Sequence, residues 1–98
     1  MCGVTEGGLP LDGVDVARES IIQGVVLRGT APVGGAYVRL LDGGGDFTAE
    51  VPTSATGHFR FFAAPGRWTL RTLVPAAEPV ERSVVAARGV VAEVEIAV

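Results

Sequence analysis

The stretch TSATGHFRFFAAPGRWTLRTLVP, residues Thr53–Pro75, decides the fold that we expect for this 98-residue chain, because it gathers most of the aromatic side chains. Two apolar runs, HFRFFA and RWTLRTLV, flank the dipeptide Pro65-Gly66. Proline fixes φ at about −65° and glycine tolerates positive φ, which together favour a turn. The stretch therefore predicts a β-hairpin.

A short loop in this hairpin places Phe61 opposite Leu70 and Phe59 opposite Thr72. Because side chains alternate along a strand, Phe59, Phe61, Trp68 and Leu70 then share one buried face. Burying each large side chain contributes roughly 1.5 to 3 kcal/mol, and Trp68→Ala is expected to cost roughly 3 to 5 kcal/mol. The neighbours expected for this face in the core are Val38, Leu40 and Ile96.

The same register brings two like charges together on the outer face of the hairpin. Arg60 and Arg71 are expected directly opposite each other, pointing outward as Arg39 does. Like charges in this position destabilise a sheet unless they are neutralised. A carboxylate from an adjoining strand, such as Glu50 or Glu93, is the structural answer, which we favour, and a bound anion or an acidic partner surface is the functional answer. Arg60 and Arg71 are thus a candidate anion or partner contact.

Turn residues divide the rest of the chain into short extended runs at intervals of roughly 8 to 12 residues, with no convincing helical period. Gly24 marks a bulge or a close backbone approach, and Pro52 ends its strand or confines it to a sheet edge. The pattern predicts a seven-stranded antiparallel β-sandwich over residues 20–98, preceded by a flexible arm over residues 1–19. A short helix near residues 13–20 is the only rival. The expected strands are 20–27, 36–41, 47–53, 58–63, 67–74, 80–86 and 90–98.

Composition narrows the possible functions. The chain is 48% hydrophobic with a mean hydropathy of +0.41, yet no run approaches the roughly 18 apolar residues of a membrane-spanning helix. Its net charge is −3 and it has no lysine, so nucleic acid is an unfavourable partner. The first residues have neither the basic nor the apolar region of a secretory signal. We expect one cytoplasmic domain with no membrane and no nucleic acid among its partners.

The polar residues do not form a recognisable catalytic or metal-binding set. His58 is the only histidine and has no second ligand at a spacing that suits zinc. Asp42 and Asp46 bracket three glycines but lack the other oxygen ligands of a calcium loop. Glu93 and Glu95 share one strand face and are expected to be solvated. The sequence predicts no metal, no cofactor and no enzymatic activity.

Cys2 is the only cysteine, so an intramolecular disulfide is excluded and a reducing compartment is favoured. Removal of the initiator Met would leave this thiol at the end of a flexible arm. The neighbouring α-amine favours the thiolate, which is the reactive form. Cys2 is therefore either a reactive site or an exposed thiol without a function.

The runs IIQGVVLRGTAPVGGAYVRLLD and FTAEVPTSATGHFRFFAAPGRWTLRTLVP resemble a family of short, uncharacterised actinobacterial proteins labelled SseC-like. That resemblance implies a role in sulphur metabolism and a partner of the thiosulfate sulfurtransferase (rhodanese-like) class. More distantly, the pattern T-G-x-F-x-F-x-x-x-P-G-x-W, which starts at Thr56, resembles the carboxypeptidase regulatory-like or transthyretin-like sandwich. Members of that superfamily serve mostly as accessory modules, which lowers the expectation of catalysis.

These observations predict a non-catalytic accessory or protein-binding module associated with sulphur metabolism. One alternative is a sulphur carrier that accepts a persulfide on Cys2, and another is an enzyme of unknown activity. Outward Phe62, Leu41 and Tyr37 leave apolar surface uncovered, and the edges of an open sandwich invite pairing. A homodimer is therefore expected.

Overall fold

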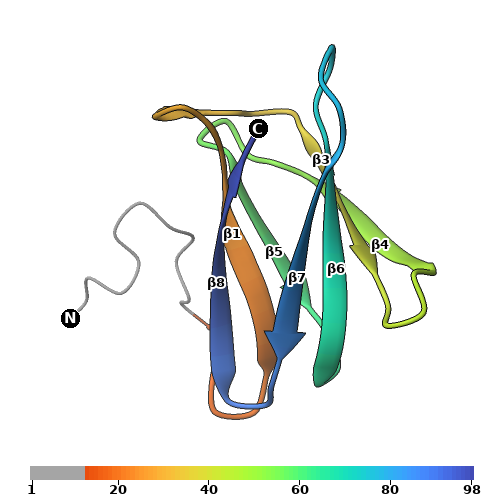
Figure 1. The fold of residues 1–98 in the computed structure, drawn as a ribbon. Helices are drawn as coiled ribbons and strands as arrows, with labels where there is room; N and C mark the ends of the chain where they lie inside the picture. The colour runs from red at the N-terminus through yellow and green to blue at the C-terminus, as the bar shows by residue number, and fades with distance from the viewer. Residues whose placement is uncertain (1–12) are drawn as a thin grey trace.

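The structure, a computed structural model, describes residues 13–98, which form a β-sandwich of two facing sheets (Figure 1). It contains no helix in this range, and hence none long and apolar enough to cross a membrane. The strands are β1 (Ser20–Arg28), β2 (Ala31–Pro32), β3 (Tyr37–Leu41), β4 (Phe47–Pro52), β5 (His58–Phe62), β6 (Gly66–Leu73), β7 (Val80–Ala86) and β8 (Val90–Ala97).

Each sheet has four strands, which we call sheet A and sheet B. In sheet A, β1 lies between β5 and β8, and the short β2 pairs with the end of β1. Sheet B has the order β4-β3-β6-β7. All pairs are antiparallel except β1 with β8, which run parallel and join the two ends of the described chain. The prediction of a β-sandwich is confirmed. The structure differs from it in having one parallel pair and an eighth strand, β2, whose two residues are too few to show an alternating pattern.

The predicted hairpin is wrong, because β5 and β6 belong to different sheets. Phe61 pairs with Ile22 of β1, whereas Leu70 pairs with Leu40 of β3. Residues 63–65 carry the chain from sheet A to sheet B instead of making a tight turn within one sheet. Alternation shows which face of a strand is buried. It does not show whether two strands pair within one sheet or lie in two sheets that pack face to face across the core.

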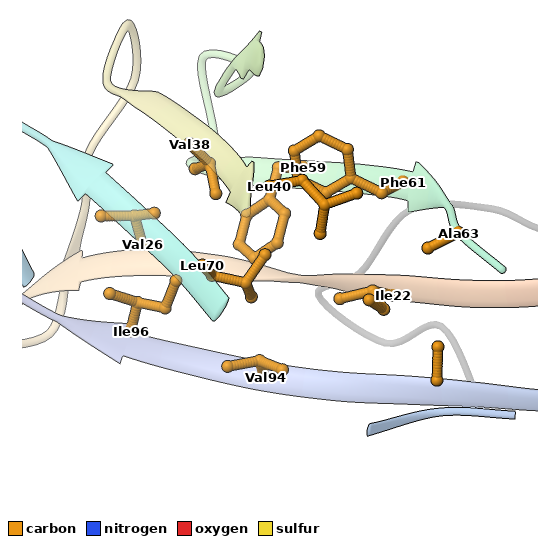
Figure 2. Close-up of a cluster of buried hydrophobic side chains, with 11 residues drawn as sticks. Ile22, Val26, Val38, Leu40, Phe59, Phe61, Ala63, Leu70, Val94 and Ile96 are labelled. Carbon is orange, nitrogen blue, oxygen red and sulfur yellow. The ribbon is translucent and has the colours of Figure 1, made fainter. Parts of the chain in front are cut away.

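The inside and outside faces of these two strands are nevertheless as predicted. Phe59 and Phe61 from sheet A are almost fully buried and lie close together, with ring centroids 6.1 Å apart. They point toward Leu40 and Leu70 of sheet B (Figure 2). Trp68 is half-buried against the same cluster. The buried cluster consists of Ile22, Val26, Val38, Leu40, Phe59, Phe61, Ala63, Leu70, Ala86, Val94 and Ile96.

The predictions made for Gly24, a close backbone approach, and for Pro52, a strand end at a sheet edge, are confirmed. A Cβ atom on Gly24 would lie 1.9 Å from the carbonyl oxygen of Val94, so β1 and β8 approach too closely there for any side chain. Pro52 is the last residue of β4, an edge strand. The next residue, Thr53, donates its N–H to the Ala36 carbonyl at 2.7 Å, so the nitrogen of Pro52 faces away from the sheet.

The segment before β1 forms a turn and not the rival helix. The Glu19 N–H donates to the Asp15 carbonyl at 3.1 Å, and the Gly89 N–H donates to the Glu19 carbonyl at 2.8 Å. This second bond ties the start of β1 to the turn between β7 and β8. The rest of the predicted arm lies outside the described residues.

Candidate functional site

The two arginines predicted to face each other do not meet. Arg60 is on β5 in sheet A, and Arg71 is on β6 in sheet B. Both point away from the core, as does Arg39, so they emerge on opposite outer faces of the sandwich. The expected Arg60–Arg71 pair is therefore wrong, for the same reason as the hairpin. The other candidate, Cys2, lies outside the described residues.

Arg60 instead belongs to a polar row across sheet A, which we call row A (Arg60, Gln23 and Glu93). These residues are in register on β5, β1 and β8. The Arg60 Nε–H donates to Gln23 Oε1 at 2.8 Å, and Gln23 Nε2 donates to Glu93 Oε2 at 3.0 Å. Gln23 is only 2% exposed. A buried neutral amide thus separates a cation from an anion, and both ends of the amide have a partner.

Arg71 belongs to a second polar row, across the outer face of sheet B, which we call row B (Glu50, Arg39, Arg71 and Glu81). The four residues are in register on β4, β3, β6 and β7. Arg39 Nε lies 2.6 Å from Glu50 Oε1, and Arg71 Nη1 lies 3.5 Å from Glu81 Oε2. Row B therefore places two arginines directly opposite each other with one carboxylate outside each.

Row B contains two opposed arginines, but they are not the predicted pair. Glu50, one of the two carboxylates expected to neutralise Arg60 and Arg71, instead pairs with Arg39, and the carboxylate beside Arg71 is Glu81. The partner of Arg71 is Arg39 and not Arg60. The alternation within β3 and β6 predicts that both side chains point outward, but it contains no signal that the two strands are neighbours.

The centre of row B has hydrogen-bond donors to spare. A guanidinium carries five N–H donors, whereas the ion pair of Arg39 uses Nε and that of Arg71 uses Nη1. Arg71 Nε is buried and has no acceptor. Both arginine side chains remain accessible, with 44% and 43% of their surfaces exposed. Row B can therefore accept further oxygen ligands between its two cations.

Apolar side chains border row B on both sides along the strands. Tyr37, which is 49% exposed, pairs with Leu73 on one side. On the other side, past an irregularity in the register of β3 and β4, Leu41 pairs with Phe47, which is 62% exposed. Row B thus has an apolar pair with one exposed aromatic ring on each side, and the Leu41 row continues across β6 and β7 into the polar residues Thr69 and Ser83.

His58 is held in a cluster of hydroxyl groups at the turn before β5. Its Nδ1 lies 2.9 Å from Thr56 Oγ1, and its backbone N–H donates to Ser54 Oγ at 3.1 Å. Ser54 and Thr56 are exposed, and the distance between Ser54 Oγ and Thr56 Oγ1 is 3.2 Å. These bonds order the turn, as side-chain hydroxyls commonly do, and they give His58 a structural role.

Asp42 also has a structural role. Its Oδ1 accepts hydrogen bonds from the Gly44 and Asp46 N–H groups, both at 2.9 Å. This arrangement closes the loop between β3 and β4 and is typical of an aspartate in a turn. Across residues 13–98, no group of three His, Cys, Asp or Glu side chains is placed to hold a metal ion.

A shallow hollow of about 280 Å³ lies between the start of β1 and the end of β5. The Phe62 ring, 58% exposed, forms part of its wall, and the hydroxyl of Ser20 is buried there without a hydrogen-bond partner. Its lining combines one cation and one anion with small and apolar side chains. The lining residues are Arg18, Glu19, Ser20, Phe62, Ala63, Ala64 and Pro65.

The family and the relatives that this chain matches in sequence are described as uncharacterised. A family model described as "Protein of unknown function (DUF1416)" matches residues 2–98. An uncharacterised protein of Mycolicibacterium smegmatis is 62% identical over 65% of this chain and 72% of its own length. The uncharacterised protein Rv0814c of Mycobacterium tuberculosis is 56% identical over 78% of each chain.

The similar solved structures share the fold at low identity. A 5-hydroxyisourate hydrolase of Klebsiella pneumoniae superposes with a TM-score of 0.63 at 21% identity, over 81% of this chain and 89% of the hydrolase. The Bacillus anthracis TIE protein superposes with a TM-score of 0.70 at 12% identity, over 79% of this chain but 16% of that much longer protein. These neighbours identify a transthyretin-like sandwich, and at such identities the likeness concerns the fold alone.

Proposed function

Because this chain belongs to the DUF1416 family of uncharacterised proteins, we propose from its own surface that it is a non-catalytic, protein-binding module. The observation that supports this proposal is that Tyr37, and Phe47 where it pairs with Leu41, remain exposed in the rows on either side of Arg39 and Arg71 in sheet B. Tyrosine, phenylalanine and arginine are the residue types enriched at protein interfaces. Tyrosine and arginine are also enriched among the few residues that carry most of the binding energy of an interface.

The resemblance to SseC-like proteins adds a specific partner to this proposal. It implies an accessory role in sulphur metabolism, with a cytoplasmic thiosulfate sulfurtransferase as the partner. The sandwich would dock on the partner through its outer face, and the partner would supply the chemistry. Turnover by the purified chain, abolished by one substitution at a polar residue, would instead identify an enzyme.

A capture experiment from the native host tests the binding module. The full chain is immobilised as wild type, as the Tyr37→Ala/Phe47→Ala variant and as the control Val90→Ala. Val90 is a fair control because it is also an exposed apolar side chain, at 46%, but lies on β8 in sheet A. A sulfurtransferase that binds wild type and Val90→Ala but not the sheet B variant supports the proposal.

Two results would contradict it. Equal capture by all three proteins would show that the outer face of sheet B is not the docking surface. Absence of any stable partner on wild type, while a control module captures its own partner, would count against a binding role altogether. Melting curves of the variants separate a loss of binding from a loss of fold.

A second candidate function, sulphur transfer, is favoured by the presence of one thiol in the whole chain. If the protein carries sulphur, the acceptor must be Cys2, because a persulfide requires a thiolate and there is no other cysteine. After incubation with a sulfurtransferase and thiosulfate, wild type is expected to gain about 32 Da, one sulphur atom, and Cys2→Ser to gain nothing. Equal labelling, or none, removes this function.

We also propose that the protein forms a homodimer through an outer face of the sandwich. Arg82 Nη1 on β7 donates to the Glu95 carbonyl on β8 at 2.7 Å, so this bond connects the edge strands of the two sheets. Pro52 interrupts the edge of β4. These edges are therefore less suited than an outer face to pairing with a second chain. Phe62 on sheet A is the best-exposed apolar side chain available for a dimer away from sheet B. Light scattering is expected to give about twice the 10.1 kDa mass of one chain, and Phe62→Ser to give the monomer. A monomeric wild type would contradict it.

A further inference from the structure

We propose that Arg39 and Arg71 together bind a carboxylate side chain in an extended segment of the partner protein, between apolar residues of that segment. This inference rests on the proposed protein-binding function and specifies the chemistry that the partner presents. The site is the centre of row B, where two positively charged arginines occupy paired positions on β3 and β6. Arg71 Nε in this pair has no hydrogen-bond acceptor.

The charge order of row B has a gap for one anion. From β4 to β7 the side chains are a carboxylate, two guanidinium groups and a carboxylate, in the order Glu50, Arg39, Arg71 and Glu81. A carboxylate placed between the two arginines would make the signs alternate across the whole row. Opposed like charges weaken a sheet, and an intervening anion would remove that repulsion while the outer carboxylates stay in place.

The donors needed for this carboxylate are present. Arg39 contacts Glu50 through Nε, which leaves both of its Nη groups for a ligand. Arg71 contacts Glu81 through Nη1 at the long distance of 3.5 Å, which leaves Nη2. Guanidinium groups bind carboxylates through two parallel N–H bonds, so two neighbouring guanidinium groups can share the two oxygens of one carboxylate.

The apolar pairs on each side of row B, Tyr37 with Leu73 and Leu41 with Phe47, indicate a protein segment and not a free anion. Tyr37, Arg39 and Leu41 alternate along β3, so their side chains recur every two residues, at roughly 7 Å. An extended segment lying along β3 presents its own side chains at the same spacing. A segment with an acidic residue at its centre and apolar residues two positions away on both sides therefore matches the order of side chains along β3.

A peptide titration tests this recognition. The probe is a capped five-residue peptide with leucine at both ends, glutamate in the middle and threonine between them, and its control has glutamine in the middle. The protein is the full ¹⁵N-labelled chain, observed by NMR at the arginine Nε–H signals. We expect the glutamate peptide to shift the signals of Arg39 and Arg71 and to bind about tenfold or more tightly than the glutamine peptide.

Charge-matched variants locate the site. Arg39→Gln and Arg71→Gln are expected to remove the preference for glutamate, whereas Arg88→Gln, which makes the same change in net charge in the exposed turn before β8, should keep it. Equal weakening by all three variants would show a non-specific charge effect and overturn the proposal. Equal affinity for the two peptides would also overturn it.

Two further results distinguish this inference from the function on which it rests. If acetate produces the same shifts as the glutamate peptide at the same concentration, the site binds free anions and the protein segment is excluded. If the peptides are not distinguished but capture from the host still depends on Tyr37 and Phe47, the binding module stands and carboxylate recognition fails.

Discussion

Row A and row B both combine arginine and glutamate side chains, but they differ in what lies next to each arginine. In row A the neutral amide of Gln23 separates Arg60 from Glu93, and the amide is hydrogen-bonded at both ends. In row B, Arg39 and Arg71 occupy directly paired positions on neighbouring strands, with no amide residue between them. Gln23 is buried and must be satisfied to be tolerated, whereas the arginines are accessible and water can solvate them. Row A therefore links β5, β1 and β8 through side-chain hydrogen bonds, whereas row B keeps donors available for a ligand.

The largest difference between the two sheets should appear in the core beneath these rows. Phe59 of sheet A is 2% exposed, whereas Trp68 of sheet B is half-buried. The indole N–H of Trp68 donates to the Ala64 carbonyl at 2.8 Å, at the margin of the core. We expect Phe59→Ala to cost about 4 kcal/mol and Trp68→Ala about 3 kcal/mol in the free energy of unfolding. Urea titration of both variants measures this, and a larger loss for Trp68→Ala would reverse the ranking.

Close packing of β1 against β8 should give the next largest effect. Gly24→Ala puts a methyl group against the Val94 carbonyl, 1.9 Å away, and neither backbone can move without disturbing row A. We expect a loss of about 3 kcal/mol in the free energy of unfolding. Gly44→Ala is the control, because its nearest neighbour is an Asp42 oxygen at an ordinary 3.5 Å. Equal melting temperatures for the two variants would show that β8 can shift to make room.

The sequence predicted the features that depend on single strands. Strand-forming residues and turn signals predicted seven of the eight strands, and alternation predicted the buried faces of β3, β5, β6 and β8. The backbone chemistry of Gly24 and Pro52 predicted a close approach and a sheet edge. The pairing of strands was not predictable in the same way. A turn at Pro65-Gly66 suits a hairpin, but a link of a few residues can also cross from one sheet to the other.

The polar rows depend on that pairing, which explains why they were missed. Arg39 and Arg71 become neighbours only because β3 and β6 pair across a long separation in sequence. Gln23 did give a signal, since it is a polar residue within a run of β-branched and aliphatic ones. A buried amide requires hydrogen-bond partners, but only the order β5-β1-β8 identifies Arg60 and Glu93 as those partners.

Gln23→Leu tests whether row A stabilises sheet A. Leucine has a similar volume but cannot bond to Arg60 or Glu93, so a half-buried cation loses an acceptor and a carboxylate loses a donor. Hydrogen bonds to charged groups contribute more than neutral ones, and we expect a loss of about 2 kcal/mol in the free energy of unfolding. Thermal unfolding measures the effect. An unchanged or raised melting temperature would show that row A is replaceable by apolar packing.

Arg39→Gln should have the smallest effect, because two changes of opposite sign nearly cancel in row B. The substitution removes the ion pair with Glu50, which is partly exposed and therefore weak, and it also removes the repulsion from Arg71. We expect the free energy of unfolding to change by no more than about 0.5 kcal/mol.

Glu50→Gln sharpens this test, because it removes the same ion pair but leaves the two arginines facing each other. It should therefore destabilise the protein more than Arg39→Gln, by a few tenths of a kcal/mol up to about 1 kcal/mol at low salt. In about 1 M salt, where the Debye length falls to about 3 Å, the difference between the two variants should disappear. Urea unfolding of both variants at low and high salt measures it. If Arg39→Gln proves the more damaging variant at low salt, the arginines do not repel each other and the centre of row B has no electrostatic need for an anion.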